Sequence, residues 1–160
     1  MSAKRKLLFV QGDVEGAAGM VKLYWPIFLY SRLREHPGYE HAVIYSPSVE
    51  YAVWAISQAD ALVFYGHGYS GGVWLGSRKE NLTESQFGIE EVRKLALARG
   101  GRRLDFVHIA CCDTLRSTEW IEAWLAIANE VIGFDEITYD IRKPLIIPRA
   151  KTIRRAVEPD

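Results

Sequence analysis

The chain has 160 residues, of which 49% are hydrophobic and 12% aromatic, and its 20 basic residues balance its 20 acidic residues. This length and composition predict one globular domain with its own core and exclude a disordered chain. The balanced charge gives no indication of a polyanion-binding surface, so neither nucleic acid nor a membrane is expected as a partner.

The first element in chain order is an apolar run at 7–10, which follows a basic start of the chain. Four apolar residues are too few for a signal peptide or for a membrane span. We therefore expect a cytoplasmic protein in which both cysteines are reduced.

Short apolar runs then alternate with stretches of helical period. The runs predict buried strands at 7–10, 42–45, 61–65 and 104–110, and further strands at 131–134 and 145–147. The helical stretches cover 20–33, 49–56, 89–97 and 120–128. Buried strands separated by helices predict a three-layer α/β/α sandwich with a mostly parallel sheet of about six strands.

No repeat or linker divides the sequence, so we expect a single domain over 1–160, with its core at about 5–150. Lys and Arg residues gather near the carboxyl end, where Pro144, Pro148 and Glu158 interrupt them. We interpret residues 149–160 as a solvated basic tail rather than as a surface for nucleic acid or acidic lipid.

A glycine-rich segment with one histidine, His67, directly follows the strand expected at 61–65. Glycines at 66, 68, 71, 72 and 76 preclude a regular helix here. We expect a hairpin in which residues 73–75 pair with a segment near Leu82. His67 would then lie at the carboxyl end of a strand, where α/β sheets bind their ligands.

The two cysteines, Cys111 and Cys112, are adjacent at the end of the strand expected at 104–110. If this strand lies parallel to the one before His67, about 4.8 Å separates the two strands. The imidazole can then take the thiol proton, and the thiolate is a nucleophile. Because side chains alternate along a strand, only one of the two cysteines can readily face His67. The backbone N–H groups of Gly68 and of the nucleophile are placed to bind an oxyanion.

The sequence around these residues resembles the two motif blocks of the caspase-like (clan CD) cysteine peptidases, and is closest in pattern to bacterial CHAT domains. The first block is an apolar strand ending in His-Gly, present at 61–68, and the second is an apolar strand ending in Ala-Cys, present at 106–111. The interval between His67 and Cys111 is compatible with the roughly 50 residues that separate the corresponding residues of caspases.

This resemblance implies a cysteine endopeptidase in which His67 is the general base and Cys111, directly after Ala110, is the nucleophile. Backbone N–H groups of Gly68 and Cys111 would form the oxyanion hole. A peptide or protein substrate is the expected partner, and some relatives also form homodimers or associate with other domains. No metal and no cofactor are expected.

The pattern says less about the substrate. Ile109 stands two residues before Cys111, where caspases have Gln and metacaspases have Asp, both of which help to bind the substrate. Specificity for Asp is therefore not expected. Ile109 and Asp13 are the candidate substrate-binding residues, and Asp13 or Glu15 would meet a basic residue unless both are ordinary loop acids.

Several alternatives stay open. The main one is a catalytically inactive caspase-fold protein that acts as a binding or regulatory module, with the aromatic stretch at 23–30 as its partner surface if that stretch is not buried. A nucleotide site at the glycine-rich turn 11–19 is disfavoured because Asp13 and Glu15 would repel phosphate. A zinc site from His67, His108 and the two cysteines is disfavoured because adjacent cysteines on a strand do not easily reach one ion. A vicinal disulfide would form a strained ring.

Overall fold

The computed structural model describes residues 4–12, 36–76, 85–135 and 150–156. The helix expected at 20–33, the strand expected at 145–147 and the hairpin partner expected near Leu82 lie outside these ranges.

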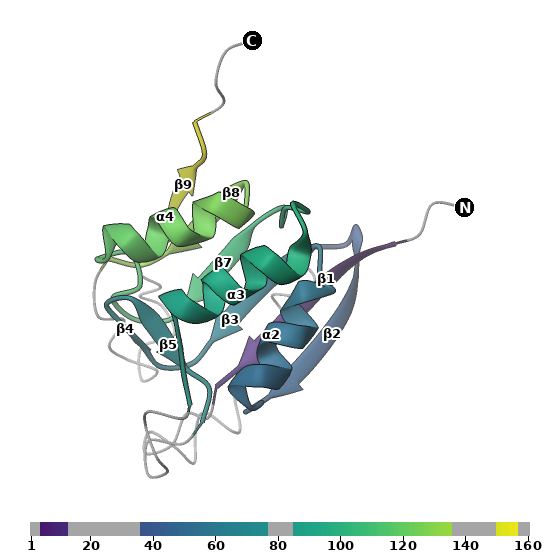
Figure 1. The fold of residues 1–160 in the computed structure, drawn as a ribbon, viewed down its shortest axis with the longest axis horizontal. Coiled ribbons are helices and arrows are strands. Elements are labelled where there is room, and N and C mark those ends of the chain that lie inside the picture. The colour runs from purple at the N-terminus through teal and green to yellow at the C-terminus, as the bar shows by residue number, and fades with distance from the viewer. Residues whose placement is uncertain (1–3, 13–35, 77–84, 136–149, 157–160) are drawn as a thin grey trace.

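Six strands form a central sheet in the order β2-β1-β3-β7-β8-β9 (Figure 1). Their bounds are β1 (Arg5–Gln11), β2 (Tyr39–Tyr45), β3 (Ala61–Tyr65), β7 (Val107–Ala110), β8 (Glu130–Gly133) and β9 (Lys151–Arg154). The first five pair in parallel, and β9 runs antiparallel to β8. The prediction of a mostly parallel sheet of about six strands is confirmed.

Three helices lie side by side over one face of this sheet (Figure 1): α2 (Val49–Ser57), α3 (Ile89–Arg99) and α4 (Thr118–Ile127). Ser48 and Ser117 cap α2 and α4 by accepting backbone N–H groups in the first turn, which defines where these helices begin. In the described ranges, α2 lies between β2 and β3, α3 between β3 and β7, and α4 between β7 and β8. Because these strands pair in parallel, they deliver their carboxyl ends to the same edge of the sheet. No helix in the described ranges is long and apolar enough to cross a bilayer.

The main core fills the space between the sheet and the helices. The ring of Trp124 on α4 packs against Phe64 of β3, with ring centroids 6.0 Å apart. Val107 and Ile109 of β7 also point into this helix-side core, whereas Val63 belongs to a second buried cluster on the other face of the sheet. Because side chains alternate along a strand, this alternation determines whether a residue at a strand end points to the helix side of the sheet or to the opposite side.

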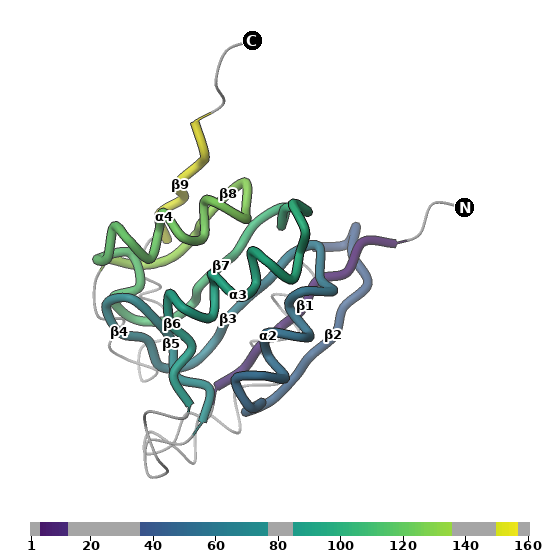
Figure 2. Tube along the Cα trace, in the orientation of Figure 1, coloured from purple at the N-terminus to yellow at the C-terminus, as the bar shows by residue number. Residues whose placement is uncertain are grey.

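A smaller antiparallel sheet lies beyond the carboxyl end of β3 (Figure 2). It consists of β4 (Gly68–Tyr69), β5 (Gly72–Trp74) and β6 (Gln86–Gly88). Val73 and Phe87 from this sheet are buried in the helix-side core, which fixes the small sheet to the domain. The glycine-rich segment forms a hairpin of β4 and β5, and β5 also pairs with β6 at 86–88, whereas the sequence indicates a partner nearer to Leu82.

The basic segment near the carboxyl end contains a strand, β9, where the composition indicated only a solvated tail. Ile153 packs against the main core, and the charged residues on either side of it are exposed. Arg154 Nε donates to Glu130 Oε1 at 2.7 Å, and Lys151 pairs with Asp135. An edge strand with one partly buried side chain has almost no apolar pattern, which explains why the sequence predicts a solvated tail here and not a strand.

Arg99 in the last turn of α3 is buried, and it ties α3 to the end of α2. Its Nη1 donates to the carbonyl oxygens of Ile56 and Ala59 at 2.9 and 2.8 Å. Methionine would replace much of the side-chain volume but leave these carbonyls without a donor. We expect Arg99→Met to lower the free energy of unfolding by about 2 kcal/mol.

Urea denaturation followed by circular dichroism measures this effect. Arg93→Met is the matched control, because Arg93 lies on the exposed side of the same helix and pairs with the exposed carboxylates of Glu90 and Glu119. A surface change of this kind costs about 0.5 kcal/mol or less. Equal losses in the two variants would contradict the role given to Arg99.

Candidate active site

The carboxyl ends of β1, β3 and β7 lie in a row at one edge of the sheet. Gln11, Tyr65 and Ala110, the last residues of these strands, are register partners across the two ladders. His67 follows β3 by two residues, and Cys111 directly follows β7. The two sequence motifs therefore leave adjacent parallel strands at the same edge, which is the arrangement that their chemistry requires.

Gly68 links the two motifs directly. A Cβ placed on Gly68 would lie 2.5 Å from the carbonyl oxygen of Cys112 and 2.7 Å from the Cβ of Cys111. The backbone of β4 therefore packs directly on both cysteines, and only glycine fits at position 68 without a shift of the chain.

The pairing of β4 with β5 determines where the N–H of Gly68 points. The N–H of Trp74 donates to the carbonyl oxygen of His67 at 2.9 Å. This bond makes Gly68 and Val73 a non-hydrogen-bonded pair of the ladder, so the N–H of Gly68 points away from β5. A donor in this position suits the oxyanion role expected from the sequence.

His67 occupies the bend between β3 and β4. It is partly buried, and its Nε2 atom has no exposed surface. The preceding Gly66 has φ +151°, which glycine adopts readily, and it lets the chain turn sharply out of β3. A Cβ on Gly66 would lie 3.3 Å from the backbone nitrogen of Gly12, so the ends of β1 and β3 are also closely packed below His67.

Cys111, which the motif indicates as the nucleophile, is 2% exposed and belongs to the helix-side core together with Ile109. Burial strongly raises the pKa of its thiol, and Cys112 raises this pKa further. A hydrogen bond from the backbone N–H of Gly66 opposes these effects without cancelling them. The thiol is therefore held protonated at neutral pH, whereas attack needs the thiolate.

Cys112 differs from its neighbour in exposure. It is half-buried and belongs to neither core cluster. The next residue, Asp113, has φ +55° and begins a tight turn, in which the N–H of Arg116 donates to the Asp113 carbonyl oxygen at 3.2 Å. Thr114 Oγ1 donates to the carbonyl oxygen of Cys111 at 3.2 Å. Cys112 thus lies at the start of a well-held turn.

Of the expected substrate-binding residues, the described part of the chain includes Ile109. Ile109 is fully buried on the helix side because it follows Val107 in phase along β7, so its side chain offers a substrate no surface. Asp13 and Glu15 lie outside the described residues, as does the aromatic stretch at 23–30.

Gln11 is a polar residue at this edge that the sequence motifs do not indicate. It is 3% exposed, and its Oε1 atom has no hydrogen-bond partner within the described part of the chain. Leu7 and Phe9, in phase with Gln11 on β1, lie in the cluster on the face away from the helices. The one sequence signal is a glutamine that ends an otherwise apolar buried run. A buried acceptor of this kind is a candidate for contact with a bound molecule.

Among the described residues, no group of three or more His, Cys, Asp or Glu side chains could hold a metal ion. His108, which the zinc alternative would require, is 6% exposed within β7.

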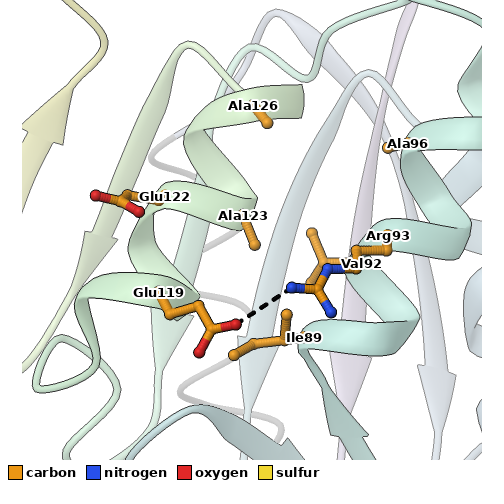
Figure 3. Close-up of a pocket in the computed structure, with 8 residues that line it drawn as sticks. All are labelled: Ile89, Val92, Arg93, Ala96, Glu119, Glu122, Ala123 and Ala126. Carbon is orange, nitrogen blue, oxygen red and sulfur yellow. Dashed lines mark hydrogen bonds and ion pairs between the residues drawn. The ribbon is translucent and has the colours of Figure 1, made fainter.

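A groove of about 270 Å³ lies between α3 and α4 (Figure 3). Most of the residues that line it are apolar, such as Ala96 and Ala123. Arg93 Nη2 lies 3.2 Å from Glu119 Oε1 across the groove. The residues that line this groove include neither cysteine nor histidine. The candidate chemistry therefore belongs to the edge of the sheet and not to this groove.

The solved structures that resemble the chain in fold include two C11 proteases. One is a secreted C11 cysteine protease from Bacteroides thetaiotaomicron, iotapain, with a TM-score of 0.57 and 10% sequence identity over 86% of this chain and 54% of that chain. The other is an inactive zymogen of a C11 protease from Parabacteroides distasonis, with a TM-score of 0.51 and 18% identity over 84% of this chain and 49% of that chain. The chain has a caspase-like fold.

At this level of identity the similarity shows the fold alone, and the chain spans about half the length of both structures. Both are C11 proteases, so they support the fold of a caspase-like cysteine peptidase and do not address the CHAT pattern. No protein-family model and no curated protein sequence matches the chain.

Proposed function

We propose that the protein is a cysteine endopeptidase in which His67 acts together with a thiol of the pair Cys111 and Cys112. The observation that carries this proposal is the packing of Gly68 against both cysteines, because it places the residue next to His67 in contact with the end of β7. The similarity in fold to two C11 proteases supports the same class of reaction.

The reaction follows from the groups at this edge. His67 takes the proton of the thiol, and the sulfur attacks the carbonyl carbon of a peptide bond while the N–H of Gly68 stabilises the oxyanion. The C–N bond breaks, and His67 returns the proton to the leaving amine. Water then hydrolyses the thioester, which releases the acid and restores the thiol. The sequence motif alone favours Cys111 as the nucleophile, and the proposed function holds for either cysteine of the pair.

The substrate is a peptide or protein in this proposal. The amide oxygen of Gln11 would accept a hydrogen bond from a substrate group, and Asp13 is the candidate partner for a basic residue. Within the caspase-like proteins we place the chain nearest to the CHAT domains, because Asp113 and Thr114 follow the cysteines as in that pattern.

Covalent labelling tests the proposal. We expect peptides that carry a thiol-reactive ketone in place of the scissile bond to modify the folded protein at a single cysteine of the pair, found by mass spectrometry of the digested protein. The same peptides with the ketone reduced to an alcohol are the control and should leave the thiols unmodified. Absence of any adduct across a varied peptide panel would contradict the proposal and favour a non-catalytic binding module.

A further inference from the structure

We propose that Cys112, and not Cys111, is the thiol that attacks the substrate, and that Cys111 is a residue of the core. This inference rests on the proposed function and identifies its reacting atom.

The phase of β7 provides the first argument. Val107 and Ile109 point into the helix-side core, and Cys111 continues their phase into the same cluster with 2% of its surface exposed. Extending the alternation by one residue places Cys112 on the other face, with His108. Cys112 is half-buried and lies outside the helix-side cluster, which agrees with this position.

Access to the sulfur provides the second argument. The backbone of β4 covers Cys111, because a Cβ on Gly68 would come within 2.7 Å of the Cys111 Cβ. The backbone N–H of Gly66 also donates to the Cys111 sulfur, which holds it against the end of β3. Because Cys111 is 2% exposed, a peptide carbonyl could reach this sulfur only after the surrounding chain had moved. Burial also raises the pKa of the Cys111 thiol, so its thiolate is disfavoured.

The surroundings of the two cysteines provide the third argument. The face of the sheet toward the helices offers Cys111 apolar neighbours such as Ile109 and Leu115. The opposite face carries Gln11, whose buried Oε1 atom has no partner in the described ranges. A substrate on this face would meet a polar anchor and Cys112 together. The backbone of Asp113, immediately after Cys112, is in the left-handed region with φ +55°. Such backbone conformations are frequent at functional sites, which also favours Cys112.

The chemical step uses the groups already described. The proton of the Cys112 thiol passes to His67, and a bond forms between the Cys112 sulfur and the carbonyl carbon. The C–N bond breaks, and the amine leaves with the proton that His67 carried. Water restores the thiol by hydrolysis of the thioester, so the cycle needs no oxidant and no reductant.

Two matched variants, Cys111→Ala and Cys112→Ala, test the inference. We expect Cys112→Ala to lose both the covalent adduct and about 10⁴-fold or more of kcat/KM, as removal of an enzyme nucleophile does. Cys111→Ala should keep the adduct and most of the activity, while its melting temperature falls by a few degrees because a buried sulfur is lost. Iodoacetamide should modify only Cys112 in the folded protein and both cysteines in urea.

The outcomes separate this inference from the proposed function. If Cys111→Ala abolishes hydrolysis and Cys112→Ala retains it, the inference is overturned and the proposed function stands. If both variants are inactive, the adduct of the wild-type chain decides, since modification of Cys112 supports the inference and modification of Cys111 overturns it. If the folded wild-type chain forms no adduct, or if both variants retain full activity, the proposed function itself fails.

Discussion

His67→Ala is expected to lower kcat/KM for peptide hydrolysis by about 10²–10⁴-fold, the usual contribution of a positioned general base. The fold should persist, because His67 belongs to neither core cluster and lies in the bend between β3 and β4. Steady-state kinetics with a fluorogenic peptide measures the loss, and far-UV circular dichroism checks the fold.

His41→Ala is the matched control for this variant. His41 lies in the edge strand β2, where its Nε2 is 3.0 Å from the carbonyl oxygen of His36, and it takes no part in the candidate site. Its replacement should leave hydrolysis unchanged. If His67→Ala and His41→Ala were equally active, His67 would not be the base, and the proposed pair of residues would have to be abandoned.

Gly68→Ala is expected to impair stability and hydrolysis together. The added methyl group would lie 2.5 Å from the Cys112 carbonyl oxygen and 2.9 Å from Thr114 Cγ2, so β4 has to shift away from the end of β7. Overpacking of this kind costs about 1–3 kcal/mol of unfolding free energy. Under the proposed function, the same shift moves His67 relative to the thiol, and a misplacement of about 1 Å costs about 10²-fold in rate.

Urea denaturation and peptide kinetics measure the two effects. Gly38→Ala provides the control, because a Cβ at Gly38 would meet nothing within 4 Å. It should change neither quantity appreciably. A Gly68→Ala protein with the stability and activity of the wild type would show that the close packing between the two motifs is not needed.

Much of the fold could be predicted because its elements bury apolar side chains with a clear period. The helices expected at 49–56 and 89–97 correspond closely to α2 and α3, and the strand expected at 61–65 is β3. The basic strand β9 could not be predicted, since Ile153 is its one residue packed on the core. Its pairing with β8 depends on the rest of the sheet and not on a local pattern.

The candidate site could be predicted only in part. The motifs ending in His67 and in the two cysteines correctly indicated adjacent strand ends, and alternation required the cysteines to differ. Which of them faces the core depends on which side of the sheet the helices cover, and that is a property of the assembled domain. Gln11 was missed for the same reason, because its neighbours at the sheet edge are distant in sequence.

The register that joins β3 to β7 also bears on when the protein could act. Leu62 pairs with Val107 and Tyr65 with Ala110, and α3 and all three strands of the small sheet lie between these strands in the chain. Parallel pairing over such a separation forms slowly, because the entropy cost of closing a long loop comes before the strands make any stabilising contact. A partly synthesised or partly unfolded chain would therefore hold both motifs without the capacity to cut. Under the proposed function, hydrolysis can begin only after β3 and β7 have paired.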